Sequence, residues 1–510
     1  MRNRTFLAAA LAVAFVAVPG RTQAQDDDTS VSVTNTLQLE YRVDNKNKSD
    51  VDDDYGTILN RLNLSGNSGG ISTQLRIDTT GFVFQPDEAG DAYQDDTRIE
   101  RLTVQYDLDT WQLIGGDFYQ QLGRGFALSI RKVDEVGLDV AIRGGKAQFD
   151  KGEHEGTLFA GESNPGNTDS VTQFFLEDPR DIFAGGAYKF SGFDDVTVGA
   201  HALYFQPRER LLPGEGRDKT LVGGLTATWD GVDWLSLYVE GDVQQRELAS
   251  IVEEGYAGYT QVDMNFGDLT LLAEGMYTDA FELKGSTNTS VGANFSYNQS
   301  PTLERFDQEV LSNRSVKGGR LRAEYYIDSA STSVYVNGMF RRNQIGEDTD
   351  ALDQVHAYGG IEASLQDGDA RLNASGGWRD ESQADTDVKS MVHGEVDYVQ
   401  PVGGGYALHI ADTTEFRTFE DEDYLRGSTF LGMEKSGLGS FTLEFGYDTQ
   451  NHSSEVRNIF WAGILGWEVT DDITLRATGG TQRGGLKCVA GVCRIFPAFA
   501  GVKTELVGRF

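Results

Sequence analysis

The chain is 510 residues long and strongly acidic, with 79 aspartates and glutamates against 44 lysines and arginines and a formal net charge of −35. Because binding to nucleic acid needs concentrated positive charge, this balance excludes a nucleic acid partner. Aromatic residues make up 11% of the chain, and there are 61 glycines. This composition argues against a disordered acidic chain and favours a β protein with many turns.

The first two dozen residues, Met1 to Ala24, have the pattern of a secretory signal. Two arginines precede an apolar stretch from Phe6 to Val18, and residues 22–24 offer a small-residue cleavage site. We therefore expect residues 1–24 to be a signal peptide and residues 25–510 to form the mature protein. No later segment has eighteen consecutive apolar residues, so helices that span a membrane are not expected.

Polar and apolar residues alternate over stretches of about ten positions from about residue 30 to the C-terminus, which is the signature of transmembrane strands. In the stretch 320–327, for example, Arg322 and Glu324 share one face while Leu321 and Tyr325 share the other. A soluble β-sandwich would also alternate, but its strands are usually shorter. The pattern therefore favours a barrel that crosses a membrane.

Short and long connections also alternate along the chain, as expected of an outer-membrane barrel with short periplasmic turns and longer outer loops. Eleven short turns are predicted, near residues 66–70, 107–110, 148–153, 191–195, 230–233, 266–268, 328–331, 366–369, 401–405, 435–439 and 470–472. Longer or more acidic segments lie between them, at residues 44–55, 81–97, 164–180, 208–219, 282–315, 344–355 and 484–496. Eleven turns imply twelve hairpins. The predicted fold is therefore an all-β, transmembrane, antiparallel up-and-down β-barrel of about 24 strands, within a range of about 20 to 26.

The last residues form one more alternating strand that ends in an aromatic side chain. Leu506 and Phe510 share one face of this strand. The segment resembles the C-terminal signature of outer-membrane barrels, which the barrel-insertion machinery recognises. The resemblance implies that Leu506 and Phe510 are part of an insertion signal.

The least regular part of the chain is the glycine-rich stretch from Gly115 to Leu128, continued by residues 137–144. It resembles a motif of uncharacterised outer-membrane β-barrels of gliding and environmental bacteria, and more loosely the glycine-rich stretch of alginate-export-type, porin-like barrels. The resemblance covers about thirty residues and implies the class and location of the protein, not its substrate. Since glycines allow close packing, residues 120–135 either fold into the lumen or form an ordinary surface loop.

In the first case, the basic side chains of this segment form a pore constriction that favours anionic solutes. The candidate constriction residues are Arg124, Arg131 and Lys132. Alternation also places charged side chains of both signs on the inward face of the strands, where they either line a polar lumen or pair across strands. The candidate lumen-lining residues are Arg76, Arg101, Arg322, Glu324, Arg371, Glu395, Arg417, Glu444 and Arg476.

The two cysteines, Cys488 and Cys493, are five positions apart, and in an exported protein we expect them to form one disulfide that closes a small loop. No histidine lies close to them in the sequence, so no metal site is predicted there. Catalytic residues, cofactor-binding residues and cofactors are not expected, because spacing assembles no catalytic constellation. Acidic clusters in the predicted outer loops are more simply explained by solvation and by cation bridges to lipopolysaccharide.

These observations favour an outer-membrane channel or export conduit for a hydrophilic solute or polysaccharide, with anionic solutes favoured by the basic constriction. The alternative is a structural or assembly barrel, without conductance, of a surface motility, adhesion or secretion system. An outer-membrane enzyme is the least favoured reading. The expected partners are outer-membrane lipid and lipopolysaccharide, the barrel-insertion machinery and periplasmic or surface proteins.

Overall fold

The computed structural model describes residues 29–46, 53–84, 93–134, 137–169, 171–209, 211, 217–249, 251–288, 293–304, 313–344, 351–383, 386–419, 422–450, 456–489, 492–496 and 498–510. Strands make up most of these residues, and the helical elements among them are the short 3-10 turns η3 (Asp328–Ala330) and η4 (Gln366–Gly368). Within these ranges, no helix has the length and apolar character needed to cross a membrane. The predicted signal peptide, residues 1–24, lies outside the described residues.

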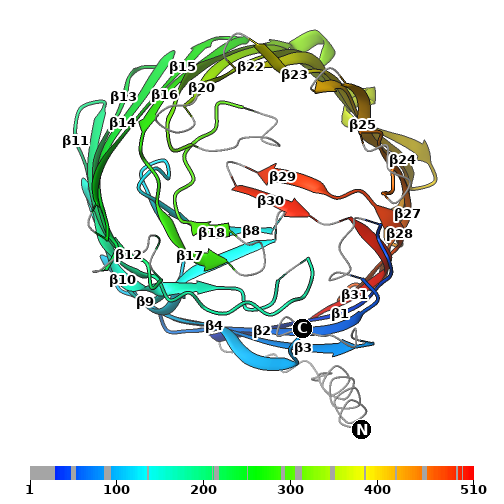
Figure 1. Ribbon diagram of the computed structural model, residues 1–510, viewed down its shortest axis with the longest axis horizontal. Helices are drawn as coiled ribbons and strands as arrows, with labels where there is room; N and C mark the ends of the chain where they lie inside the picture. The colour runs from blue at the N-terminus through cyan, green and yellow to red at the C-terminus, as the bar shows by residue number, and fades with distance from the viewer. Residues whose placement is uncertain are drawn as a thin grey trace.

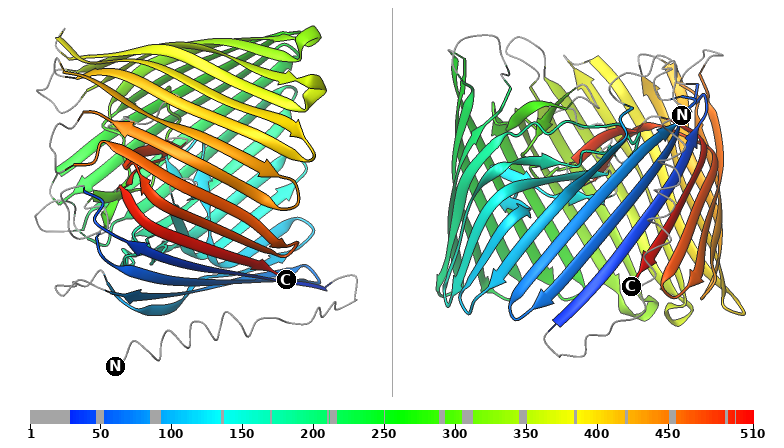
Figure 2. Two further views of the ribbon diagram at one scale, coloured as in Figure 1. Left: turned by 90° about the vertical axis from the view of Figure 1, so that its right-hand side faces the viewer. Right: turned by 90° about the horizontal axis from the view of Figure 1, so that it is seen from below.

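Twenty-four antiparallel strands form a closed barrel. It is seen end-on as a ring in Figure 1 and from the side, with its strands tilted, in Figure 2. The ring closes where β1 pairs with the last strand, with Thr34 opposite Arg509 and Arg42 opposite Gly501. The strands are β1 (Thr29–Arg42), β2 (Gly56–Ser68), β3 (Ile71–Val83), β4 (Asp96–Asp107), β5 (Trp111–Phe118), β9 (Leu138–Lys151), β10 (His154–Pro165), β11 (Ile182–Phe193), β12 (Val196–Gln206), β13 (Lys219–Val232), β14 (Leu235–Leu248), β15 (Ile251–Phe266), β16 (Leu269–Asp279), β19 (Val316–Ile327), β20 (Thr332–Asn343), β21 (Leu352–Leu365), β22 (Ala370–Gln383), β23 (Thr386–Gly403), β24 (Tyr406–Phe419), β25 (Glu422–Lys435), β26 (Gly439–Asp448), β27 (Ile459–Thr470), β28 (Ile473–Gln482) and β31 (Phe499–Arg509). The predicted fold class is confirmed.

The short turns lie where the sequence predicts them. Each of the eleven predicted turns joins two strands that pair with one another, from Gly69 and Gly70 between β2 and β3 to the turn between β27 and β28. Gly69 has φ +53° and Gly70 has φ +82°, a conformation that glycine adopts without strain. Because the wall has an even number of strands, both of its ends lie at the rim that carries these short turns.

Because polar and apolar side chains alternate along the strands, the two faces of the barrel wall differ in polarity. On β26, the side chains of Phe441, Leu443 and Phe445 are about half exposed, whereas Glu444 between them is only 9% exposed. The same division holds on β22, where Trp378 is exposed and Arg379 is buried. The outward face is therefore apolar, as contact with lipid requires, and the charged side chains point inward.

Several short elements lie inside the ring (Figure 1). Those labelled there are β8 (Lys132–Val133), β17 (Lys284–Asn288), β18 (Ala293–Ser296), β29 (Gly485–Val489) and β30 (Val492–Phe496), and they belong to three long connections of the chain. The first of these connections also contains the short strands β6 (Gln120–Leu122) and β7 (Leu128–Ile130). In the β29–β30 hairpin, Cys488 lies directly opposite Cys493 in the backbone register. Their side chains lie outside the part of the structure that is described, so the disulfide stays a prediction.

Candidate functional site

The interior of the barrel is the candidate site, and its charged side chains come from the strand wall. Arg76 on β3 forms ion pairs of 2.7 Å with Asp78 and with Asp139. Arg101 on β4 lies 3.0 Å from Glu100 and 3.1 Å from Asp139. A shift of register between β3 and β4 turns both Glu100 and Arg101 inward, which strict alternation does not predict.

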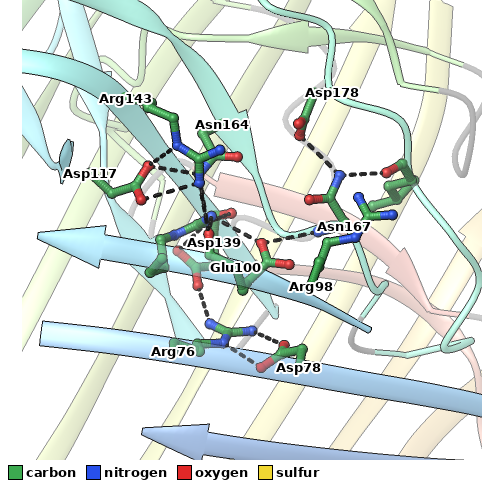
Figure 3. Close-up of polar contacts among 12 residues, drawn as sticks. Arg76, Asp78, Arg98, Glu100, Asp117, Asp139, Arg143, Asn164, Asn167 and Asp178 are labelled. Carbon is green, nitrogen blue, oxygen red and sulfur yellow. Dashed lines mark hydrogen bonds and ion pairs between the residues drawn. The ribbon is translucent and has the colours of Figure 1, made fainter. Parts of the chain in front are cut away.

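This network continues around the inner wall, as Figure 3 shows. Asp117 at the end of β5 accepts hydrogen bonds from Arg143 at 3.1 Å and from Asn164 at 2.7 Å. Glu100 accepts one from the backbone N–H of Asn167, in the connection that follows β10. Because nearly all of these groups are partnered, the network fastens β3, β4, β5, β9 and β10 together and does not leave free charge for a solute.

The other predicted lumen residues are also placed on the inward face, and most have partners across strands. Arg371 lies 3.2 Å from Asp397 and Arg476 lies 3.4 Å from Glu505, each on a neighbouring strand. Arg322 lies 2.8 Å from Glu324 and Arg417 lies 2.7 Å from Glu415, each on the same strand. Glu444 accepts a hydrogen bond of 2.6 Å from Gln482, and Glu395 accepts one of 3.4 Å from Ser375. The paired state of these side chains is the alternative that the sequence left open.

The glycine-rich connection between β5 and β9 packs against distant strands. Phe126 is fully buried, and its ring centroid lies 6.2 Å from that of Tyr259 on β15. The backbone N–H of Arg124 donates to Glu240 of β14 at 2.8 Å, and that of Gln299 donates to the carbonyl of Gly125 at 2.9 Å. Figure 1 shows β8 of this connection inside the ring, so the segment folds inward.

The three basic residues proposed for the constriction have different surroundings within this segment. The guanidinium of Arg124 lies 4.6 Å from the ring centroid of Tyr238, and Arg131 donates to Gln299 at 2.8 Å. Lys132 forms an ion pair of 2.6 Å with Asp134. Only Arg124 lacks an ion pair or hydrogen bond from its side chain among the interactions of the described residues.

An apolar core between the inward segments and the wall was not expected from the sequence, which predicted a polar lumen. The core includes Phe183, Leu203 and Phe205 of the wall together with Leu128 and Tyr297 of the inward segments. The sequence does contain a signal for this core, because residues 202–205 (Ala-Leu-Tyr-Phe) do not alternate between polar and apolar side chains. A continuous apolar run is typical of a strand that is buried on both faces.

Partly buried arginines gather on another side of the interior, around Asp448 at the end of β26. Arg426 lies 3.6 Å and Arg483 lies 4.0 Å from the carboxylate of Asp448. Burial, followed by the nearby charge of Arg426, lowers the pKa of Arg483 to about 10. The Nε atoms of Arg426 and Arg483 are buried without a hydrogen-bond partner. This arginine cluster therefore holds more positive charge than its own carboxylate neutralises.

A cavity of about 450 Å³ opens beside the arginine cluster. It is lined by polar and charged groups that include Lys46, Asp448, Arg457, Asn458 and Arg483. Sequence reasoning missed Arg426, Arg457 and Arg483. Arg426 could have been found, because it alternates with Leu425, which is exposed on the outer face. Arg457 and Arg483 lie in connections, where no periodicity marks their direction.

Histidines on the inner wall also meet partners that spacing does not reveal. His356 on β21 lies 2.7 Å from Glu304 through Nδ1 and 2.9 Å from His393 on β23 through Nε2. His201 on β12 lies 2.6 Å from Asp242 on β14. Both arrangements join strands that are not neighbours in the ring.

No family model matches the sequence, and no curated protein matches it. Solved structures resemble the fold at low sequence identity. A chain of the P pilus tip assembly intermediate PapC-PapD-PapK-PapG of E. coli is 12% identical with a TM-score of 0.51, covering 96% of this chain and 62% of that chain. The P pilus usher (PapC) translocation pore is 11% identical with a TM-score of 0.46, covering 94% and 99%. The copper transporter OprC is 12% identical with a TM-score of 0.49, covering 94% and 80%. These likenesses concern the fold alone.

Proposed function

We propose that residues 25–510 form a channel or export conduit in the outer membrane of a Gram-negative bacterium, after residues 1–24 are removed as a signal peptide. The cargo is a hydrophilic, anionic solute or polysaccharide. The proposal includes lipid and lipopolysaccharide around the apolar outer face and insertion machinery that acts on the strand carrying Leu506 and Phe510. Periplasmic or surface proteins are the further partners of this barrel.

The observation that supports an anionic cargo is the arginine cluster beside the 450 Å³ cavity. The chain has a net charge of −35, yet here Arg457 and Arg483 line a cavity with buried donors that lack hydrogen-bond partners. Guanidinium groups bind carboxylate and phosphate oxygens well, because they present several donors in a fixed plane. Arg124, Arg131 and Lys132 of the inward segment are the proposed constriction on the same path.

The test is ion selectivity in planar lipid bilayers, with the full mature chain inserted under a potassium chloride gradient. A unit charge about 8 Å from a permeating ion in water contributes about 0.5 kcal/mol, so each lost arginine should change the permeability ratio about twofold. We expect the Arg457→Gln/Arg483→Gln variant to shift the reversal potential towards cation selectivity.

Arg476→Gln is the matched control, because Arg476 also points inward but is exposed and paired with Glu505. It should shift the reversal potential less than the double variant does. Equal shifts, or none in the double variant, would remove the argument for an anionic cargo while leaving a channel in place.

A second candidate function has its own supporting observation, which is the apolar core inside the ring. This core fixes inward segments against wall strands between β5 and β20, as expected of a structural or assembly barrel that does not conduct. A folded, inserted barrel that stays electrically silent would favour this second candidate. A steady open conductance would favour the channel.

A further inference from the structure

One histidine and two acidic side chains that can bind a metal ion meet on the inner wall, where the segment with the proposed constriction contacts β14. His201 of β12, Gly224 of β13 and Asp242 of β14 lie in one row across three neighbouring strands. Because Gly224 has no side chain, the imidazole Nε2 of His201 approaches to 2.6 Å from the carboxylate Oδ1 of Asp242. Glu240 lies two residues before Asp242 and therefore shares its face.

The three side chains are deeply buried, with exposed fractions of 7% for His201, 2% for Glu240 and 3% for Asp242. One ligand atom from each lies within 4.8 Å of the others. Within the part of the chain that the structure describes, neither carboxylate forms an ion pair with a lysine or an arginine. The imidazole of His201 is therefore the one basic side chain among the described residues that forms an ion pair with this group.

Two oxygen atoms of this group have no hydrogen-bond partner, although both are buried. They are Oε1 of Glu240 and Oδ2 of Asp242. The other oxygen of Glu240, Oε2, accepts hydrogen bonds from the hydroxyl of Tyr238 at 2.5 Å and from the backbone N–H of Arg124 at 2.8 Å. A buried carboxylate oxygen is costly unless it is paired or bound to a metal ion.

We infer that His201, Glu240 and Asp242 bind a divalent transition metal ion, with Zn²⁺ as the best fit to the donor set. One imidazole nitrogen and two carboxylate oxygens are ligands that zinc accepts at about 2.0 to 2.2 Å. Ligands at that distance around a tetrahedral ion are about 3.5 Å apart. Metal binding therefore requires rotations of the three side chains from their present spacing, which is 2.6 Å between His201 and Asp242 and at most 4.8 Å for any pair. The ion takes the place of the proton between His201 and Asp242, which is released on binding.

The inward segment turns directly beside this site. The turn from Leu122 to Gly125 lies over Glu240, and a Cβ atom on Gly123 would be 1.9 Å from the free oxygen Oε1. Gly123 has φ +54°, so its backbone is also in a conformation that favours glycine. The metal ion therefore ties β12 and β14 of the wall to the segment that carries the proposed constriction. This inference does not depend on the proposed channel function.

The test uses the full mature chain, folded in detergent, stripped with a chelator and titrated with Zn²⁺ while bound metal is counted. We expect about one zinc ion per chain to bind more tightly than those at exposed acidic groups. His201→Ala and Glu240→Gln should each weaken this binding at least tenfold. His154→Ala is the control, because His154 lies at the far rim of β10 and contacts Tyr188 instead.

X-ray absorption at the zinc edge supplies a second measurement that does not depend on any variant. It should show nitrogen and oxygen ligands at about 2.0 to 2.2 Å with the scattering pattern of one imidazole. Equal zinc binding by the wild type and Glu240→Gln, or a spectrum without imidazole, would overturn the inference. Because Glu240→Gln preserves size, it keeps the comparison meaningful even if His201→Ala fails to fold.

Discussion

Glycine 224 determines how closely two ionisable side chains approach one another across three strands. A Cβ atom at this position would lie 2.2 Å from Oδ1 of Asp242 and 2.3 Å from Nε2 of His201. Both distances are far below van der Waals contact, and both side chains are buried. The absence of one methyl group therefore makes the 2.6 Å contact between His201 and Asp242 possible.

We predict that Gly224→Ala destabilises the barrel by about 1–3 kcal/mol, because it overpacks the inner wall and separates a buried hydrogen-bonded pair. The measurement is the urea concentration at the midpoint of unfolding in lipid vesicles. Gly223→Ala is the control, since a Cβ atom there has no neighbour within 4 Å. Similar unfolding midpoints for the two variants would show that the row of His201, Gly224 and Asp242 tolerates an added methyl group.

Alternation predicted which way individual side chains point, but it could not predict their partners. Arg417 and Glu444 were identified from period two alone, and they are buried on the inward face. The contact of His356 with Glu304 joins positions 52 residues apart, one of them in a connection. Such contacts depend on how long connections fold, which local periodicity does not encode.

At the scale of elements, hairpins were predictable and inward connections were not. A hairpin needs only a turn flanked by two alternating stretches, so all eleven short turns could be found from the sequence. The segment β17–β18 is held instead by Asp181, which accepts hydrogen bonds from the backbone N–H of Ser286 at 2.9 Å and from the hydroxyl of Tyr297 at 2.8 Å. These partners are more than one hundred residues away in the chain, so no local pattern indicates them.

The inward segment around β17 should loosen in acid. Burial raises the pKa of Glu282, but hydrogen bonds from Arg246 and Lys284 outweigh it and lower the pKa below the ordinary value of 4.5. A lowered pKa in the folded state means that Glu282 stabilises the fold above the ordinary pKa. This contribution is lost as the pH falls through the lower, folded value. Hydrogen exchange at residues 280–288 and 293–304, corrected for intrinsic rates, should therefore show less protection below about pH 4.

Glu282→Gln provides the control for this pH effect. It removes the charge at every pH, so protection of residues 280–288 and 293–304 should be low already at neutral pH and should change less on acidification. An identical pH dependence in wild type and variant would assign the effect to other carboxylates of this acidic chain.

At the scale of the whole molecule, the predicted strand number was right because a barrel needs only two local signals. The number of short turns gives the number of hairpins, and polar–apolar alternation gives the face of each strand that meets lipid. These two signals are enough to predict a closed sheet. The apolar core inside one sector of the ring lies beyond these signals, since it forms between the wall and connections distant in sequence. The sequence therefore predicts the fold class and the outer surface of this barrel, but it does not predict which segments fill the interior.

The apolar outer face leads to a prediction about one strand, β26. Leu443 is 50% exposed on the outer face near the middle of this strand, and Thr442 beside it points inward. An arginine on the lipid side at mid-membrane costs about 2–4 kcal/mol. We therefore expect Leu443→Arg to reduce the free energy of unfolding in vesicles by about that amount, and Thr442→Arg, which places the same charge towards the interior, to reduce it by clearly less. Equal losses would mean that the outer face of β26 is not in contact with lipid, and the membrane orientation of the barrel would have to be abandoned.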